Sequence, residues 1–321
     1  MLLLAVVFQA PLRALLDVPG LRTGSTVFVA VCVQALPFLV LGVLVSGLIA
    51  AWVPPSALRA VLPRSRAAAV PVAGAAGVAL PGCECASVPV ARRLMQQGVA
   101  APAALAFLLA APAVNPIVLV STAVAFPGQP RMVLARFLGS LLTACVMGWL
   151  WLRLGKAEWF AERALRRLTD RADAACGPNA EERGRSRWTV FAETARHDLV
   201  EAAGFLVLGA VMSAVFNVAV PSGWTESLAG QAAFGVLVMA LLAVVLALCS
   251  EADAFVAAAL PGLPLLPRLV FLVVGPAVDL KLVALQAGTF GRAFAARFAP
   301  MTFAVAVVCS VLVGAVVLGG A

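Results

Sequence analysis

Long apolar windows follow one another along this chain, and they limit its possible folds more than any other feature does. They cover the ranges 25–53, 67–80, 99–126, 132–152, 199–221, 231–250, 268–290 and 298–319. A helix needs about 20 such residues to cross a bilayer, whereas about 10 to 14 indicate a re-entrant or buried piece. The chain is 63% hydrophobic and only 12% charged, which leaves too few polar groups to cover a soluble core of 321 residues. We therefore predict an all-α polytopic membrane protein.

The densest concentration of charge lies in one connection, between the fourth and fifth windows. Ten Lys or Arg residues and seven acidic residues occur from Arg153 to Arg196, which is typical of a solvated cytoplasmic loop under the positive-inside rule. The net charge of +8 therefore does not indicate a nucleic-acid partner. The predicted parts are an N-terminal interfacial segment (1–24), a first membrane repeat (25–154), the cytoplasmic loop (155–197) and a second membrane repeat (198–321).

The two membrane parts resemble each other in sequence. Aligned at an offset of 167, the ranges 33–54 and 200–221 are identical at ten of 22 positions. At an offset of 164, the range 107–116 shares the pair F-L and the triplet P-A-V with the range 271–280. Matches in the same order at nearly constant spacing predict an internal duplication.

The positive charges favour inverted over parallel repeats. If 67–97 forms a re-entrant hairpin, the arginines at 59, 64 and 66 lie on the same side as the cytoplasmic loop, as the charge rule prefers. Each half then crosses the membrane an odd number of times, which inverts the second half. The length of 231–250 argues the other way, because it is enough for a full crossing.

The stretch 80–122 is built unlike an ordinary membrane span. Pro81, Gly82 and Pro89 interrupt its first part, and a second interruption runs from Pro112 to Pro116. Interrupted helices free backbone groups, so they occur in membranes only where they are buried or line a cavity. Half-helix ends that meet near the midplane are the usual binding sites of transporters. We therefore predict that broken or re-entrant helices from both repeats form the substrate site.

A few acidic residues occupy matching places in the two interrupted regions. Glu84 lies at the first interruption, Glu251 and Asp253 lie at its counterpart, and Asp279 aligns with Asn115. A charge at bilayer depth costs at least about 2.5 kcal/mol, so such residues usually face a cavity. A structural ion pair or a helix cap remains the alternative for each acid, and Asn115 can equally cap a half-helix. The predicted substrate-binding residues are Cys83, Glu84, Cys85, Asn115, Pro116, Cys249, Glu251, Asp253 and Asp279.

Lys281 and Glu201 belong to the same group of charged residues but are expected to play other roles. Lys281 is a candidate structural partner for an acid on a neighbouring helix, because it cannot face Asp279 from position i+2 of one regular helix. Glu201 begins a window and is predicted to lie at the interface.

The cysteines suggest what the site binds. Cys83 and Cys85 flank a glutamate, and Cys249 aligns with Cys83 at an offset of 166. Thiolates bind soft ions and thiophilic metalloids. Two thiols at i and i+2 point apart on a helix, so sharing a ligand requires turn or extended backbone, which Pro81 and Gly82 favour. The alternative is that these are small apolar residues that allow close packing. We predict no resident metal, no cofactor and no disulfide framework.

Motifs in both halves of the chain resemble those of a known family. The motif residues are Cys83, Cys85, Pro89, Gly98, Phe107, Leu108, Pro112, Asn115 and Pro116, followed in the second half by Cys249, Ser250, Ala252, Asp253, Ala254 and Phe255. They resemble the signature of the bacterial predicted-permease family that includes the organoarsenical efflux permeases (ArsP-like, YraQ-like). The resemblance implies a multi-pass permease of the bacterial inner membrane, and for some members the export of trivalent methylated or aromatic arsenicals. Members often have Ser where this chain has Glu84.

The function predicted is secondary, ion-coupled efflux of a small thiophilic metalloid or organoarsenical-type solute. Protons are the candidate coupling ion, and the small solute and the lipid bilayer are the expected partners. The chain has no phosphate-binding loop and no H-E-x-x-H or G-x-S-x-G motif, so we do not expect an enzyme. Two alternatives stay open: a permease for another small solute in which the cysteines only pack, and a membrane subunit of a larger complex. An intramembrane enzyme is the weakest reading.

Overall fold

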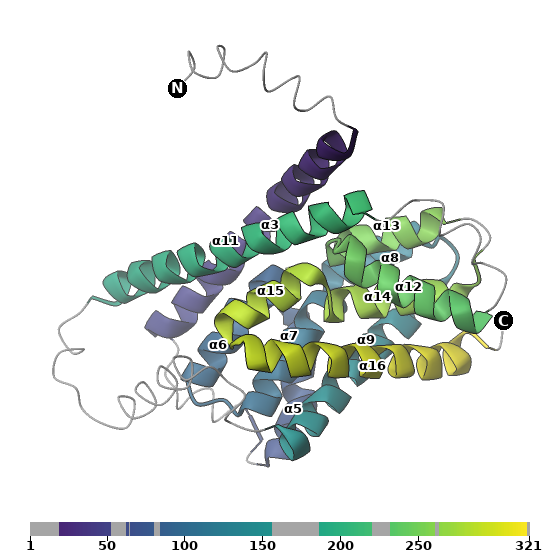
Figure 1. The fold of residues 1–321 in the computed structure, drawn as a ribbon. Helices are drawn as coiled ribbons and strands as arrows, with labels where there is room; N and C mark the ends of the chain where they lie inside the picture. Colours follow the sequence, from purple (N-terminus) through teal and green to yellow (C-terminus); the bar gives the residue numbers. More distant parts are fainter. Residues whose placement is uncertain are drawn as a thin grey trace, which may run out of the picture.

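A computed structural model describes residues 19–52, 62–63, 65–79, 84–155, 186–219, 232–260 and 263–319. All regular elements in these ranges are helices, and the long ones lie across one another in a layered bundle (Figure 1). Five helical segments are long and apolar enough to cross a membrane: Arg22–Trp52, Ala101–Ala125, Pro130–Leu154, Leu265–Thr289 and Arg292–Val317. The prediction of an all-α membrane protein is confirmed.

The first part of the chain contains two long helices with shorter helices between them. These are α3 (Pro19–Trp52), α5 (Arg66–Ala76), the 3-10 turn η1 (Gly77–Ala79), α6 (Glu84–Gln96), α7 (Ala101–Val114), α8 (Pro116–Ala125) and α9 (Pro130–Leu154). Prolines stand at the start of the last three helices, where the missing N–H removes no helical hydrogen bond. Gly98 and Gly128, both with positive φ, make the turns after α6 and α8.

The second part has the same order of long and short helices. It consists of α11 (Arg187–Ala219), α12 (Ala232–Leu246), α13 (Ser250–Ala259), α14 (Leu265–Ala277), α15 (Leu280–Thr289) and α16 (Arg292–Val317). Residues 187–197, expected at the end of the cytoplasmic loop, are helical in α11. Residues 19–24, expected in the interfacial segment, begin α3. The remaining residues of those two segments, 1–18 and 155–186, lie outside the described helices.

The window 231–250 does not form one span. Helix α12 ends at Leu246, and the chain breaks before Ser250 opens α13. Ala247 adopts a positive φ of 48° and is fully buried in this break. That backbone conformation costs an L-residue about 1–2 kcal/mol, so neighbouring packing must hold the break in place. This region therefore consists of two short helices, as 66–96 does with α5 and α6.

Helices α3 and α11 form an antiparallel pair (Figure 1). Near the end of α3 the Trp52 ring lies 5.1 Å from that of Trp188, at the start of α11. Further back along α3, Ser46 Oγ donates a 2.8 Å hydrogen bond to Asp198 Oδ2, further on along α11. The end of α3 is therefore next to the start of α11, and the two helices run in opposite directions.

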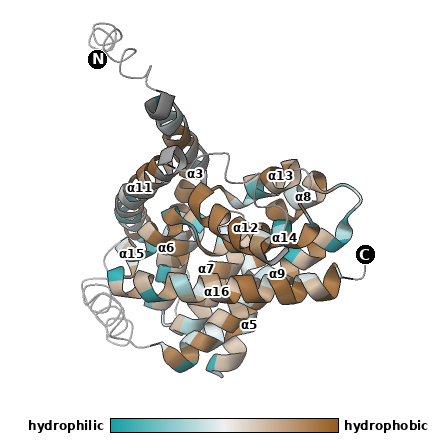
Figure 2. Cartoon of the chain, turned by 45° about the vertical axis from the view of Figure 1, so that its right-hand side comes forward, coloured by the Kyte–Doolittle hydropathy of each residue, from teal (hydrophilic) through white to brown (hydrophobic). Residues whose placement is uncertain are grey.

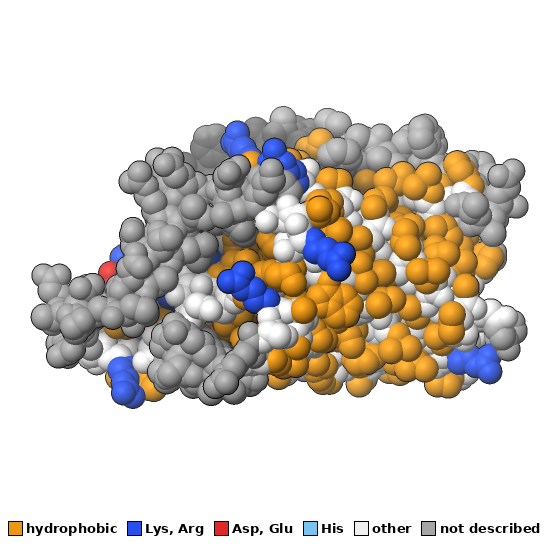
Figure 3. All heavy atoms as spheres, turned by 90° about the horizontal axis from the view of Figure 1, so that it is seen from below, with side chains coloured by type: hydrophobic (Ala, Val, Ile, Leu, Met, Phe, Trp, Pro, Cys, Tyr) orange, Lys and Arg blue, Asp and Glu red, His pale blue; other side chains and the backbone are white. Residues whose placement is uncertain are grey.

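The two broken spans occupy the interior, and the unbroken spans face outward. Most residues of α7 and α14 are buried, including Leu105 and Phe271 at 0% exposure. By contrast, α16 exposes Val308, Leu312 and Val316, spaced four residues apart. Such an apolar stripe is suited to contact lipid, and most of α16 is coloured as hydrophobic in Figure 2. Among the described residues on the face drawn in Figure 3, most side chains are hydrophobic, with a few separate Lys or Arg residues between them.

Candidate functional site

Glu84 and Lys281 form a buried ion pair at the centre of the molecule. Glu84 is the first residue of α6, and Lys281 is the second residue of α15. Lys281 Nζ lies 2.8 Å from Glu84 Oε1, and the two side chains are 2% and 1% exposed. Ser250, the first residue of α13, donates a hydrogen bond of 3.1 Å from Oγ to Glu84 Oε2. Both carboxylate oxygens of Glu84 are therefore engaged, by groups from two other helices.

Asp279 adds a second carboxylate to the same ammonium group. It is the N-cap of α15, and its side chain accepts the Leu282 N–H. Its other oxygen, Oδ2, lies 3.2 Å from Lys281 Nζ. The expectation that these two residues cannot meet from i and i+2 assumed one regular helix. Asp279 instead has extended backbone (φ −139°, ψ 170°), which turns its carboxylate back over the first turn of α15.

The third oxygen that contacts the Lys281 ammonium group belongs to a backbone carbonyl. Its Nζ donates to the carbonyl oxygen of Leu248 at 3.2 Å. Leu248 lies in the break between α12 and α13, where that carbonyl is outside a regular helix. A buried ammonium needs all its donors satisfied, and here α6, α15 and the α12–α13 break together provide the acceptors.

Asn115 occupies the matching position in the other broken span. It caps α8, with Oδ1 accepting the Val118 N–H at 2.9 Å, and its Nδ2 donates to the Ala111 carbonyl at 3.2 Å. Because proline disfavours helical backbone at the preceding residue, Pro116 explains the extended conformation of Asn115 (φ −70°, ψ 154°). The cap alternative thus describes the side-chain contacts of Asn115, and its role in binding a substrate stays a prediction.

Arg136 is a buried cation that sequence reasoning missed. It lies on α9 with 0% exposure. Its Nη1 donates to Thr122 Oγ1 at 2.6 Å, and its Nη2 donates to the Ser250 carbonyl at 2.7 Å. A signal was present, since Arg136 stands a few residues inside the apolar window 132–152. Arg136 does not lie near a proline-broken segment, because α9 is unbroken, so a search among interrupted helices does not find it.

Asp253 and Glu251 complete the charged group from α13. Asp253 is 2% exposed and its Oδ2 has no hydrogen-bond partner among the described residues. This oxygen lies only 2.6 Å from where a Cβ on Gly275 would be, so the glycine makes room for it against α14. Glu251 is half-buried, and neither of its carboxylate oxygens has a partner in the described part of the chain.

These charges interact with one another and form a single group, here called the ion cluster. It consists of Glu84, Arg136, Glu251, Asp253, Asp279 and Lys281. It joins residues of α6, α9, α13 and α15, four helices that are far apart in sequence. The cluster contains four carboxyl groups and two cations. If all six were ionised, the excess negative charge would need to be neutralised in a low-dielectric interior.

Two of the three predicted thiol ligands lie beside this cluster. Cys85 and Cys249 are 1% and 2% exposed and both are close enough to Lys281 to interact with it electrostatically. Cys85 lies within α6, and Cys249 is the N-cap residue of α13. Cys83 lies outside the described residues, so its part in binding a ligand together with Cys85 and Cys249 stays a prediction. Within the described ranges no set of three His, Cys, Asp or Glu side chains is arranged to hold a metal ion.

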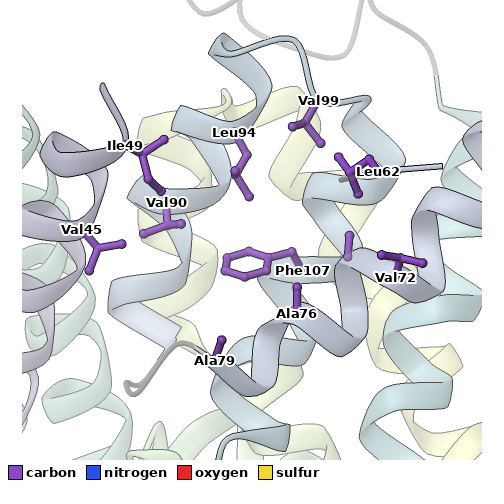
Figure 4. A pocket seen from close by; sticks show the side chains of 11 residues that line it. Val45, Ile49, Leu62, Val72, Ala76, Ala79, Val90, Leu94, Val99 and Phe107 are labelled. Atoms are coloured by element: carbon purple, nitrogen blue, oxygen red, sulfur yellow. The ribbon is translucent and has the colours of Figure 1, made fainter. Parts of the chain in front are cut away.

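A separate apolar cavity lies beside α6. Its volume is about 290 Å³, and it is bounded by α3, α5, α6 and α7. Phe107 points into it between Val90 and Leu94 on one side and Ala76 on the other (Figure 4). All its lining side chains are apolar, so it offers contact area to a hydrophobic group and no hydrogen bonds from side chains.

Comparison with known proteins shows to which family this chain belongs. Residues 21–315 match the family ArsP_1, described as predicted permease. A Streptococcus mutans protein, named for a two-component membrane permease complex subunit, is 28% identical over 291 residues, which cover 90% of this chain and 94% of that protein. The UPF0718 protein YcgR of Bacillus subtilis is 31% identical over 288 residues, covering 88% and 94% of the two chains. No solved structure matches significantly. With its apolar spans, this chain is thus a multi-pass membrane permease rather than an enzyme, and it belongs to the predicted-permease family ArsP_1.

Proposed function

We propose that this permease moves a small solute through the ion cluster by alternating access, with ion coupling. The observation that carries the proposal is the bond between Lys281 of one half and Glu84 of the other, deep in the protein. Intramembrane ionisable residues are costly and mark transport pathways. The cluster also lies where interrupted helices of both halves end, which is where transporters bind their substrates.

The two halves are proposed to be inverted repeats, and three contacts support this. Helices α3 and α11 carry the segments that align at an offset of 167, and they pack antiparallel. Glu84 and Ser250, which are 166 residues apart, hydrogen-bond directly to each other. Equivalent residues touch in this way only near a pseudo-two-fold axis, and antiparallel equivalent helices indicate an axis in the membrane plane. Asn115 and Asp279 cap the second half-helix of each half.

The solute class proposed is a small thiophilic metalloid or organoarsenical that is exported. Cys85 and Cys249 lie buried next to Lys281, and thiols are the protein groups that prefer soft metalloids. The apolar cavity beside α6 offers space for a methyl or phenyl substituent. Both relatives come from bacteria, which supports the inner membrane as the location.

Flux measurements in liposomes test this proposal. Purified protein would be reconstituted and offered a trivalent methylarsenical, a trivalent phenylarsenical, inorganic arsenite and a non-thiophilic solute, with and without a pH gradient. We expect transport of the organic arsenicals, a loss of at least tenfold in Glu84→Gln, and a comparable loss in Cys85→Ser and Cys249→Ser. Arg297→Met, a change at an exposed position, is the matched control.

Two outcomes would contradict the proposal in separate ways. Unchanged flux in the Cys83→Ser, Cys85→Ser and Cys249→Ser variants would remove the thiol model and leave a permease for another solute. Unchanged flux in Glu84→Gln would remove the ion cluster from the pathway.

A second candidate function is membership of a two-component permease. It is favoured by the name of the Streptococcus mutans relative, which describes a complex subunit. Full transport by the purified single chain would contradict an obligatory partner, whereas flux that appears only on adding a second membrane protein would support it.

A further inference from the structure

We propose that Asp253 is the proton-binding group of this permease, protonated in the conformation of this structure and ionised when the ion cluster rearranges. The proton site is argued from the structure alone, whereas its use in coupled transport rests on the proposed function above.

The charge balance of the ion cluster calls for a bound proton. Four carboxyl groups and two cations leave an excess of two negative charges if all six groups are ionised. Lys281 is already shared between Glu84 and Asp279. Arg136 directs both terminal nitrogens to neutral oxygens, of Thr122 and of the Ser250 backbone. Neither cation of the cluster is therefore committed to Asp253, as far as the described part of the chain shows.

The surroundings of Asp253 suit a neutral carboxyl group. It is 2% exposed, and Oδ2 meets no donor in the described part of the chain. An ionised carboxylate without a partner is very costly in such a place, and the group takes up a proton instead. Oδ2 rests against the backbone of α14 at Gly275, two residues before α14 ends at Ala277. A protonated oxygen can approach that backbone closely, whereas an anionic oxygen there would have no hydrogen-bond donor among the described residues.

The charged and titratable groups that face Asp253 come from several elements. They are Glu84 from α6, Arg136 from α9, and Asp279 and Lys281 from α15. Glu251 and Cys249 are the titratable residues next to it in sequence at the start of α13. Helix α8, which packs against α13, contains no titratable residue, and its Thr122 hydroxyl accepts a bond from Arg136. Helix α14 has one cation, Arg268, which donates to the Leu260 carbonyl at the far end of α13.

Loss of the proton has a defined structural consequence. The reaction converts the neutral carboxyl group into a carboxylate and releases one proton to water. Among the cations, Arg136 has the strongest electrostatic interaction with Asp253, and its Nε has no hydrogen-bond partner within the described ranges. The ionised group is therefore drawn toward Arg136 and away from Gly275. This movement weakens the Arg136 contacts with Thr122 and Ser250, and Ser250 is the residue that bonds to Glu84.

Infrared spectroscopy of the full-length protein in lipid tests the proton site without any solute. We expect a carbonyl stretch of a protonated carboxyl near neutral pH, shifted by carbon-13 labelling of aspartate and absent in Asp253→Asn. Asp279→Asn is the matched control, because it removes an equally buried aspartate and should leave the band. A wild-type spectrum without the band, or a band that survives in Asp253→Asn, would overturn the proposal.

Stability and flux add two further readouts. Asn imitates a protonated Asp, so Asp253→Asn should unfold at the wild-type temperature, whereas Asp279→Asn should unfold earlier. An Asp253→Asn protein that fails to fold would count against a neutral Asp253. In proteoliposomes containing a pH-sensitive dye and driven by a gradient of a trivalent methylarsenical, Asp253→Asn should lose the proton movement that accompanies each arsenical carried by the wild type, so that the ratio of protons to arsenical falls whatever the rate of arsenical flux. Retained proton movement would refute the coupling role, and absence of arsenical flux in the wild type would refute only the proposed substrate.

Discussion

Ser250 donates a hydrogen bond to Glu84 across 166 residues of sequence, with the two oxygen atoms 3.1 Å apart. Each residue is the first of a short helix, Glu84 of α6 and Ser250 of α13. The contact joins the two interrupted regions directly, and Lys281 reinforces it by pairing with the other oxygen of Glu84. A motion that separates α6 from α13 and α15 must therefore break or transfer these bonds.

Lys281→Met should destabilise the protein more than Glu84→Gln does. The first change leaves Glu84 and Asp279 without their cation, and removal of one partner of a buried ion pair costs about 3–5 kcal/mol. Glu84→Gln leaves Lys281 with Asp279 and the Leu248 carbonyl, so we expect a loss of about 1–3 kcal/mol. Denaturant unfolding in a mild detergent measures both. Equal losses would mean that Asp279 contributes nothing to holding Lys281.

Asn115→Ala should lower stability by about 1–2 kcal/mol, since it removes the N-cap acceptor of α8 and the donor to the Ala111 carbonyl. Ser65→Ala is the matched control, because Ser65 caps α5 through a single bond at an exposed position. The same unfolding measurement should show the smaller loss for Ser65. A larger loss there would contradict the assignment of Asn115 as the support of the break.

Gly275→Ala should lower both stability and transport. A Cβ at this position would lie 2.6 Å from Asp253 Oδ2, so the carboxyl group must move. Gly235→Ala is the control, since the nearest atom to its Cβ, Pro267 Cγ, is 3.6 Å away, and Ala is favoured over Gly in a helix by about 1 kcal/mol. Combining Gly275→Ala with Asp253→Ala should recover the stability lost in the single variant. No recovery would show that the glycine is needed for another reason.

Ala76→Phe should reduce transport of a phenylarsenical severalfold and leave that of a methylarsenical nearly unchanged. The new ring would enter the cavity of about 290 Å³ that Phe107 already shares, and would remove the space available to a large substituent. Ala75→Phe, on the same helix but not in the cavity lining, is the control. Equal inhibition of the transport of both solutes would mean that the cavity does not select between them.

Inverted halves place the loop after α8 and the loop after α15 on opposite sides of the membrane. Cysteines introduced at the exposed positions Gln129 and Arg292 should therefore react with an impermeant thiol reagent from opposite sides. The assay requires a background without the reactive native thiols and uses intact cells and inverted vesicles. Labelling of both from the same side would establish parallel repeats.

Much of the helical framework was predictable because hydropathy and proline act locally. The windows 99–126 and 268–290 correspond to the broken spans of α7 with α8 and of α14 with α15. The break at Asn115 follows from the proline after it, whose ring disfavours helical backbone at the preceding residue. The window 231–250 was harder, since nothing in its composition marks the turn at Ala247, which tertiary packing holds.

The sequence alone determined that this chain spans a membrane, that the windows 99–126 and 268–290 are broken near their prolines, and that acidic and thiol groups lie near interrupted regions. Those properties depend on residues within a few turns of one another. Only the tertiary structure decided the partners: Lys281 binds Glu84 from 197 residues away, and Arg136 bonds to Thr122 and to the Ser250 backbone from an unbroken helix. The physical reason is that a buried charge is stabilised by whichever oppositely charged or polar groups packing brings within about 3 Å. Local sequence pattern shows that such a charge needs partners, and only the packing of distant helices selects them.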